Sequence, residues 1–196
     1  MTKYNPNKPR LVFGVGINDA NYTVCPTVNG KSIVCPFYRS WTNMLTRCYS
    51  KAEQARRPSY IGCTVSSEWL VFSSFSKWME KQEWQGKQLD KDILIQGNKV
   101  YSSLSCIFVS AEINSLLNEQ PNRRGSYPRG VGFRVARNKY RADCNAYGKV
   151  KSLGEYDTPE EAHEAYKKFK YKYIAEIANK QSEPLRTALL NYVIEG

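Results

Sequence analysis

A cluster of arginine and lysine side chains in the last third of the chain is the part of the sequence best suited to chemistry with a polyanion. Between residues 122 and 151 nine residues are Lys or Arg, and Asp143 alone is acidic. Arginine forks pair with guanine edges in the major groove of DNA, and other cations hold phosphates. A merely solvated charged surface would mix its signs. The cluster therefore predicts a surface that binds duplex DNA.

The elements expected to carry these cations form a small domain. The sequence predicts three short strands over residues 130–135, 140–145 and 150–156, separated by turn residues at 137–139 and 147–149. A helix follows, because Thr158 and Glu161 form a capping box with Pro159 at the first helical position. Apolar residues at helical spacing then predict that this helix lies across one face of the sheet. The other face would stay open for the basic side chains, and a sheet can enter the major groove.

Short motifs of this domain resemble the APETALA/ethylene-response-factor DNA-binding domain of plant transcription factors and of mobile nucleases of phages and bacteria. They are Tyr-Pro-Arg-Gly-Val at 127–131, Lys-Tyr-Arg-Ala at 139–142, Leu-Gly-Glu-Tyr-Asp-Thr at 153–158 and Glu-Glu-Ala at 160–162, with Gly148-Lys149 and Ala165-Tyr166. The resemblance implies a three-stranded antiparallel sheet packed on one helix, with strand residues that contact double-stranded DNA. Tyr140 stands where plant members usually carry Trp. With Arg137 of the first turn included, the DNA-binding residues expected here are Arg129, Arg134, Arg137, Lys139, Arg141, Lys149 and Lys151.

The composition of the whole chain favours the same partner. Its 196 residues contain 29 Lys and Arg against 18 Asp and Glu, which gives a net charge of +11. A charge this large repels itself, and a polyanionic partner is the usual compensation, which favours nucleic acid over membrane headgroups. No apolar run is long enough to span a bilayer, and the first residues show no hydrophobic signal region. We therefore expect a cytoplasmic protein.

The sequence has six cysteines, a single histidine and no C-x-x-C pair, which limits the metal sites that it can form. Cys48, Cys63 and Cys106 stand in apolar surroundings. They either converge on a zinc ion, with Cys25 or Cys35 as a fourth ligand, or serve as small buried hydrophobic residues. The lack of paired spacing favours the second interpretation, so we expect no structural zinc.

The first part of the chain predicts a second domain. Residues 37–48 place apolar side chains at the spacing of a helix with one buried face, from which Arg39 and Arg47 project elsewhere. A helix over 66–80, extended segments over 89–95 and 106–109 around a turn at 97–98, and a short helix over 110–117 are also expected. The polar run at 118–127 is the best linker. We therefore expect domains at 1–120, of which the first 35 residues are an extension, and at 121–196, which ends in a helix.

The N-terminal domain resembles phage and prophage proteins of the HNH homing-endonuclease group over about residues 36–118. The motifs are Trp41-x-x-Met44-x-x-Arg47-Cys48-Tyr49, Gly62-Cys63-x-Val65-x-x-Glu68-Trp69, Phe72-x-x-Phe75, Leu89-Asp90-Lys91-Asp92, Gly97-Asn98-x-x-Tyr101-Ser102 and Glu112-x-Asn114. The resemblance implies a fold that contains a ββα unit and cleaves DNA with a divalent cation, Mg²⁺ or Mn²⁺. The whole chain is thus expected to be of the α+β class.

The same resemblance implies a catalytic set. An HNH site combines a general base, usually histidine, with two oxygen-bearing ligands of one divalent cation. Asp90 and Asn114 would hold the metal, Asn98 would support the loop between them, and Lys91 stands in the place of the base. Lysine is a poor base near neutral pH, and the acidic residues on either side of Lys91 strengthen its hold on the proton. The single histidine, His163, lies in the capped helix of the other domain.

Three functions are compatible with these expectations. The favoured one is a metal-dependent homing-type endonuclease of phage or mobile-element origin, which nicks or cuts duplex DNA at a site selected by the 121–196 domain. The second is an HNH-like protein that has lost catalysis and binds DNA as a regulator. The third is a phage protein that binds a host protein through its basic surface.

Overall fold

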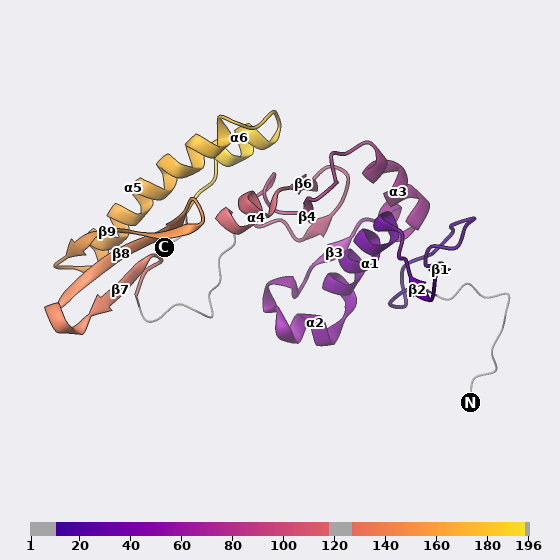
Figure 1. Cartoon of the computed structure of the whole chain (residues 1–196), viewed down its shortest axis with the longest axis horizontal. Helices are drawn as coiled ribbons and strands as arrows, with labels where there is room; N and C mark the ends of the chain where they lie inside the picture. The colour runs from indigo at the N-terminus through magenta and orange to yellow at the C-terminus, as the bar shows by residue number, and fades with distance from the viewer. Residues whose placement is uncertain (1–10, 118–126, 195–196) are drawn as a thin grey trace. The chain divides into compact units, whose positions relative to one another are not determined.

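A computed structural model describes residues 11–117 and 127–194, and it divides the chain into two compact units, Met1–Val109 and Ser110–Gly196 (Figure 1). Both units combine helices with small sheets, so the chain belongs to the α+β class, as predicted. No helix in the described parts of the chain is long and apolar enough to cross a membrane. The linker predicted at 118–127 falls outside the described residues, except for Tyr127.

The N-terminal unit packs three helices and several two-residue to three-residue strands around an aromatic core. The helices are α1 (Pro36–Tyr49), α2 (Lys51–Arg56) and α3 (Phe72–Glu80). A hairpin joins β1 (Thr27–Val28) to β2 (Lys31–Ser32); β3 (Thr64–Val65) pairs in parallel with β5 (Val100–Tyr101), and β4 (Gln88–Asp90) pairs antiparallel with β6 (Ile107–Val109). The core is built around Trp41, Met44, Trp69, Phe72 and Phe75, all almost fully buried. The helix predicted over 37–48 is confirmed by α1.

The helix predicted over 66–80 is interrupted. A 3₁₀ turn covers Ser67–Leu70, Val71 is extended, and α3 begins only at Phe72. The N-terminal segment explains the break, because Ile17 forms a parallel bridge with Val71. The backbone N–H of Ile17 donates to the Leu70 carbonyl at 2.8 Å, and the N–H of Phe72 donates to the Ile17 carbonyl at 3.0 Å. Because the Leu70 carbonyl and the Phe72 N–H bond to Ile17, they are not available for the hydrogen bonds of a continuous helix.

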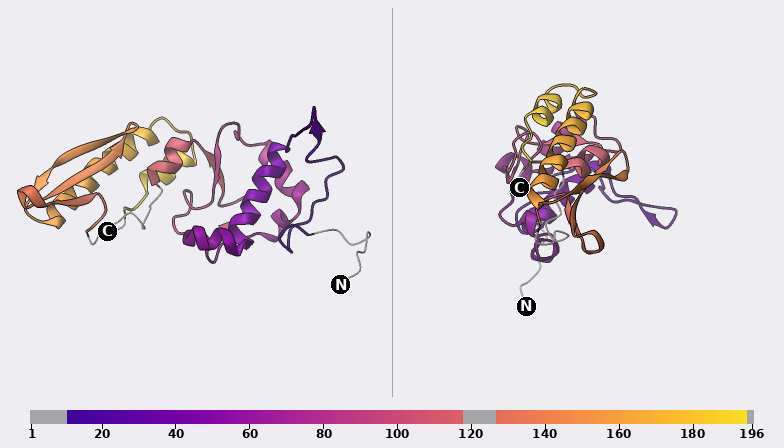
Figure 2. Two further views of the ribbon diagram at one scale, coloured as in Figure 1. Left: turned by 60° about the horizontal axis from the view of Figure 1, so that its bottom comes forward. Right: turned by 90° about the vertical axis from the view of Figure 1, so that its left-hand side faces the viewer.

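The C-terminal unit is a three-stranded antiparallel sheet packed against a long helix, as predicted. The strands β7 (Val131–Arg134), β8 (Lys139–Ala146) and β9 (Lys149–Tyr156) lie in the order β7-β8-β9. Helix α5 (Pro159–Ala178) starts at the predicted capping box, in which Thr158 accepts from the Glu161 N–H and the Glu161 carboxylate accepts from the Thr158 N–H. Figures 1 and 2 show α5 running along one face of the sheet, and α6 (Leu185–Leu190) packs on α5.

The division between the units differs from the expected one at 120/121, because α4 (Ala111–Leu117) belongs to the C-terminal unit. The Tyr173 hydroxyl on α5 donates to the Glu112 carboxylate at 3.3 Å, and the Tyr192 hydroxyl donates to the Leu117 carbonyl at 3.3 Å. These contacts join residues far apart in the sequence. The chain therefore divides between Val109 and Ser110, one helix earlier than the linker composition suggested.

Candidate functional site

The register of the sheet decides which side chains of the C-terminal unit face α5 and which face away. Ala142, Cys144 and Ala146 on β8 are buried, and β8 packs on α5. Successive side chains of a strand point to opposite faces, so Arg141 and Asn145 lie on the face away from α5. We call this the open face. Cross-strand partners share a face, so the residues paired with Arg141, which are Gly132 on β7 and Glu155 on β9, also lie there.

Four of the seven predicted DNA-binding residues come together on or beside the open face. Arg134 pairs with Lys139, two residues from Arg141 along β8, so all three share that face. Arg137 ends the 3₁₀ turn Val135–Arg137 between β7 and β8. Asn138 closes this turn in the left-handed conformation, which asparagine tolerates better than most residues. The turn thus keeps four cations within one hairpin.

Acidic side chains pair with three of these four cations. The Arg137 guanidinium lies 3.1 Å from the Glu155 carboxylate, and Lys139 forms an ion pair with Asp157. Within β8, the Nε–H of Arg141 donates to Oδ2 of Asp143 at 2.6 Å. The expectation that this surface carries charges of one sign is therefore wrong, because β9 and the residue after it bring in Glu155 and Asp157.

The remaining three predicted DNA-binding residues do not lie on the open face, so the expectation that one face carries all seven is also wrong. Lys151 is paired with the buried Cys144, and its ammonium lies 4.9 Å from the centre of the Phe169 ring on α5. Lys149 is paired with the buried Ala146, which places it on the same side. The Arg129 guanidinium lies 5.9 Å from the centre of the Tyr166 ring, also on α5.

A close contact with α5 fixes the start of β7, and sequence analysis did not detect it. Gly130 has a φ of +78°, and a Cβ atom there would lie 2.2 Å from the Tyr166 ring, so only glycine fits. His163, which is buried, places its Nδ1 atom 2.9 Å from the Arg129 carbonyl oxygen. The single histidine thus has a structural role in seating this strand on the helix.

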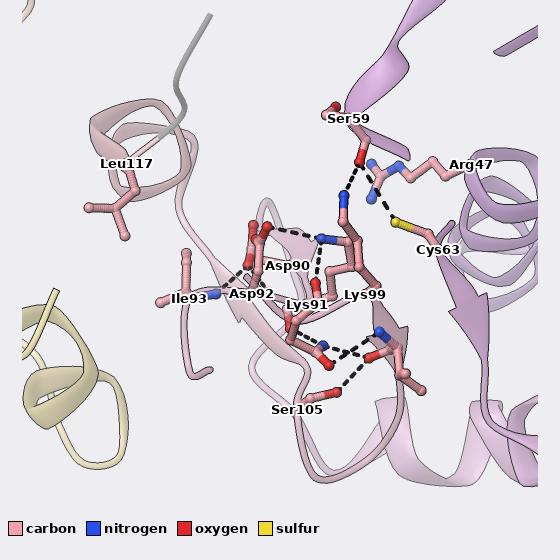
Figure 3. Close-up of polar contacts among 12 residues, drawn as sticks. Arg47, Ser59, Cys63, Asp90, Lys91, Asp92, Ile93, Lys99, Ser105 and Leu117 are labelled. Atoms are coloured by element: carbon pink, nitrogen blue, oxygen red, sulfur yellow. Dashed lines mark hydrogen bonds and ion pairs between the residues drawn. The ribbon is translucent and has the colours of Figure 1, made fainter. Parts of the chain in front are cut away.

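Three of the four residues of the expected nuclease site, Asp90, Lys91 and Asn98, lie in one hydrogen-bonded loop of the N-terminal unit (Figure 3). The Asp90 Oδ1 atom accepts from the backbone N–H groups of Asp92 and Ile93, each at 2.9 Å. This turn ends β4 at Asp90, where sequence analysis predicted an extended segment to residue 95. The Asn98 side-chain amide donates to the carbonyls of Lys91 and Val100, each at 2.7 Å, and so connects the two ends of this loop.

Lys91 is a buried hydrogen-bond donor at the centre of this loop. Only 5% of its surface is exposed, and its ammonium donates to the Asp92 carboxylate and to the Asn98 carbonyl, each at 2.9 Å. A general base needs an unprotonated nitrogen whose lone pair reaches the attacking water. In this geometry the Lys91 nitrogen is instead a double donor, so it cross-links the two ends of the loop.

The two expected metal ligands belong to different units of the chain. Asp90 lies in the N-terminal unit, whereas Asn114 lies on α4 of the C-terminal unit. Burial, reinforced by the neighbouring Asp92 charge, raises the pKa of Asp90 to about 6. Within residues 11–117 and 127–194 no group of three or more His, Cys, Asp or Glu side chains could hold a metal ion.

Three of the cysteines behave as buried apolar groups. Cys48, Cys63 and Cys106 are almost fully buried in the N-terminal unit. Burial raises the pKa of the Cys48 thiol to about 12, with a further contribution from Cys63, and burial raises the pKa of Cys106 to about 12 as well. A protonated thiol is a poor nucleophile and a poor metal ligand, so these side chains are best explained as core residues.

Comparisons of the chain with models of protein families, with curated proteins and with solved structures find no match.

Proposed function

We propose that this protein binds duplex DNA through the open face of the β7-β8-β9 sheet. The observation that carries the proposal is the grouping of Arg134, Arg137, Lys139 and Arg141 on one hairpin, on the side of the sheet away from α5. A two-stranded ribbon of this kind fits the width of the major groove. The net charge of +11 adds a long-range attraction for a polyanion.

The ion pairs on the open face are compatible with this role. The Arg137 and Asp157 side chains are largely exposed and the Lys139 side chain is 40% exposed, and an ion pair of this kind contributes only about 0–1 kcal/mol to stability. Phosphate oxygens can therefore replace Glu155 and Asp157 at little cost. The Arg141–Asp143 pair is more enclosed, with about a third or less of each side chain exposed. Both Nε and Nη2 of Arg141 contact Asp143, which leaves Nη1 and the second N–H of Nη2 to meet a base.

The four cations thus divide the work of recognition between two roles. Arg134, Arg137 and Lys139 hold phosphates and set the position of the sheet on the duplex. Arg141 presents two N–H groups to the O6 and N7 atoms of a guanine. The direct test is a titration of labelled duplex DNA with the full-length protein over a range of salt concentrations. Each phosphate contact contributes about 0.9 to the slope of log affinity against log salt, so contacts from Arg134, Arg137 and Lys139 predict a slope of about −3. A duplex affinity that does not depend on salt would contradict the proposal.

A second candidate function is cleavage of the bound DNA, and one observation favours it. The Asp90 carboxyl has a pKa of about 6, close to the value that suits a group exchanging protons near neutral pH. We propose Asp90, rather than Lys91, as the proton-transfer group if the chain is an endonuclease. Supercoiled DNA incubated with and without Mg²⁺ or Mn²⁺ tests this: nicking that is lost in Asp90→Asn supports cleavage, and binding without nicking supports the regulatory alternative. Neither binding nor nicking would favour a protein partner for the basic surface.

A further inference from the structure

A second concentration of positive charge lies in the N-terminal unit, in a pocket of about 280 Å³ between α1 and residues 84–89. One wall carries Arg39, Asn43 and Arg47, which follow each other at intervals of four residues and so lie on one face of α1. The buried face of the same helix, with Trp41, Met44, Leu45 and Cys48, packs into the core. The core thus fixes the direction in which the polar face points.

The opposite wall is a turn that approaches α1. The Trp84 and Phe37 rings pack together with their centres 5.2 Å apart, which attaches this turn to the helix. Arg47 bridges the two walls, because its guanidinium donates to the Leu89 carbonyl at 3.2 Å; the same guanidinium lies 5.6 Å from the centre of the Tyr60 ring. Lys87 extends from this wall, so cations line the pocket from both sides.

Positive charge predominates among the residues that line the pocket. Three of its lining residues are cations, Arg39, Arg47 and Lys87, and none of the lining residues that the structure describes is acidic. Lys87 does pair with Glu83 at 2.8 Å, but the Glu83 side chain is almost fully exposed. An exposed pair of this kind gives way readily to a stronger anion. This concentration of cations contrasts with the open face, where carboxylates accompany three of the four cations.

The start of α1 adds to the positive electrostatic potential of the pocket. Pro36, the first residue of the helix, lines the pocket, and the preceding Cys35 makes no side-chain cap. No acidic residue stands in the first turn. The positive end of the helix dipole is therefore not neutralised by a side chain, and it favours an anion nearby.

We propose that this pocket binds a phosphate group, carried either by a free nucleotide or by the backbone of a DNA strand. Arginine and lysine from two walls hold a tetrahedral anion through charge-assisted hydrogen bonds, and Asn43 offers a further polar contact. The volume suits one phosphate and part of its sugar. The site is distinct from the open face of the sheet and does not depend on the function proposed for that face.

The test uses isotope-labelled full-length protein titrated with thymidine 5′-monophosphate, inorganic phosphate and, as the uncharged control, thymidine. The amide signals of Arg39, Asn43 and Lys87 should shift with both phosphates and not with thymidine. The double variant Arg39→Gln/Lys87→Gln should bind thymidine 5′-monophosphate at least about tenfold more weakly. Lys51→Gln, an exposed cation outside the pocket, is the matched control and should bind like the wild type. Equal unfolding temperatures would show that the variants remain folded.

The same variants identify the source of the phosphate. If the double variant also loses duplex affinity and its salt slope falls by about one, the pocket holds a backbone phosphate. If duplex affinity is unchanged while mononucleotide binding is lost, the ligand is a free nucleotide. The proposal is overturned if neither phosphate shifts the pocket amides, or if the double variant binds both phosphates as well as the wild type. These outcomes do not depend on variants of the open face, so the two proposals can fail separately.

Discussion

The Nε–H of Arg141 donates to the Asp143 carboxylate at 2.6 Å, from a position two residues away on the same face of the same strand. This contact and the ion pair between Nη2 and Asp143 hold the guanidinium above the sheet, and Nη1 and the second N–H of Nη2 remain for a base. An arginine held in this way loses less side-chain entropy when it pairs with a guanine.

Asp143→Asn tests whether this contact serves recognition. The substitution removes a negative charge, so electrostatics alone would strengthen DNA binding. We expect a loss of discrimination instead: affinity for a sequence selected from a random pool falls by about three- to tenfold, while affinity for unselected duplex is unchanged or rises. Competition binding measures both values. Equal discrimination by the variant and the wild type would mean that Asp143 does not position Arg141.

Gly130→Ala should destabilise the C-terminal unit. The new methyl group would lie 2.2 Å from the Tyr166 ring, and the φ of +78° disfavours any residue with a side chain. Together the two effects are expected to lower the free energy of unfolding by about 2–4 kcal/mol. The control is Gly132→Ala on the same strand, where no atom lies within 4 Å of the added Cβ. Urea unfolding should separate the two variants, and similar stabilities would contradict the close contact between β7 and α5.

Lys91→Met tests the structural role of the buried lysine. The substitution leaves the Asn98 carbonyl and the Asp92 carboxylate without their donor, and we expect it to lower the free energy of unfolding by about 1–3 kcal/mol. DNA binding should be unchanged. Lys81→Met, at an exposed lysine of the same unit, should have little effect on stability. A stable Lys91→Met protein without nicking activity would instead return Lys91 to the catalytic role.

The raised pKa of Asp90 predicts how the stability of the fold changes with pH. Its pKa is raised to about 6 from a usual value of 3.8, so between these values the folded state binds a proton that the unfolded state does not. Stability should therefore fall as the pH rises from about 4 to about 6. Asp90→Asn should remove this slope and stabilise the protein at pH 7, by about 3 kcal/mol at most. Urea unfolding of both proteins at several pH values checks this prediction, and parallel profiles would contradict it.

The sequence predicted best the elements whose signals are local. The capping box at Thr158 and the turn residues between the strands depend on a few neighbouring side chains, and they placed α5 and the three-stranded sheet correctly. Contacts distant in sequence were not predictable in the same way. Ile17 interrupts the helix expected over 66–80, and Tyr173 and Tyr192 attach α4 to the C-terminal unit.

The candidate sites show the same limit. Counting charges along one stretch of chain detected the cations of the hairpin, but Glu155 and Asp157 reach them only through the pairing of β8 with β9 and the residue that follows. The helical spacing indicated that Arg39 and Arg47 project away from the buried face of their helix, but it did not identify a binding site. The significance of these two residues depends on Lys87, which the sequence does not place beside α1.

The most direct test of the central claim compares the two faces of the sheet. Arg134→Ala/Arg141→Ala removes two cations from the open face, and Lys149→Ala/Lys151→Ala removes two from the side of α5, so both variants change the net charge equally. We predict that the first variant binds duplex DNA at least about tenfold more weakly, while the second stays within about threefold of the wild type. Equal losses in both variants would show that net charge, and not the open face, binds the DNA.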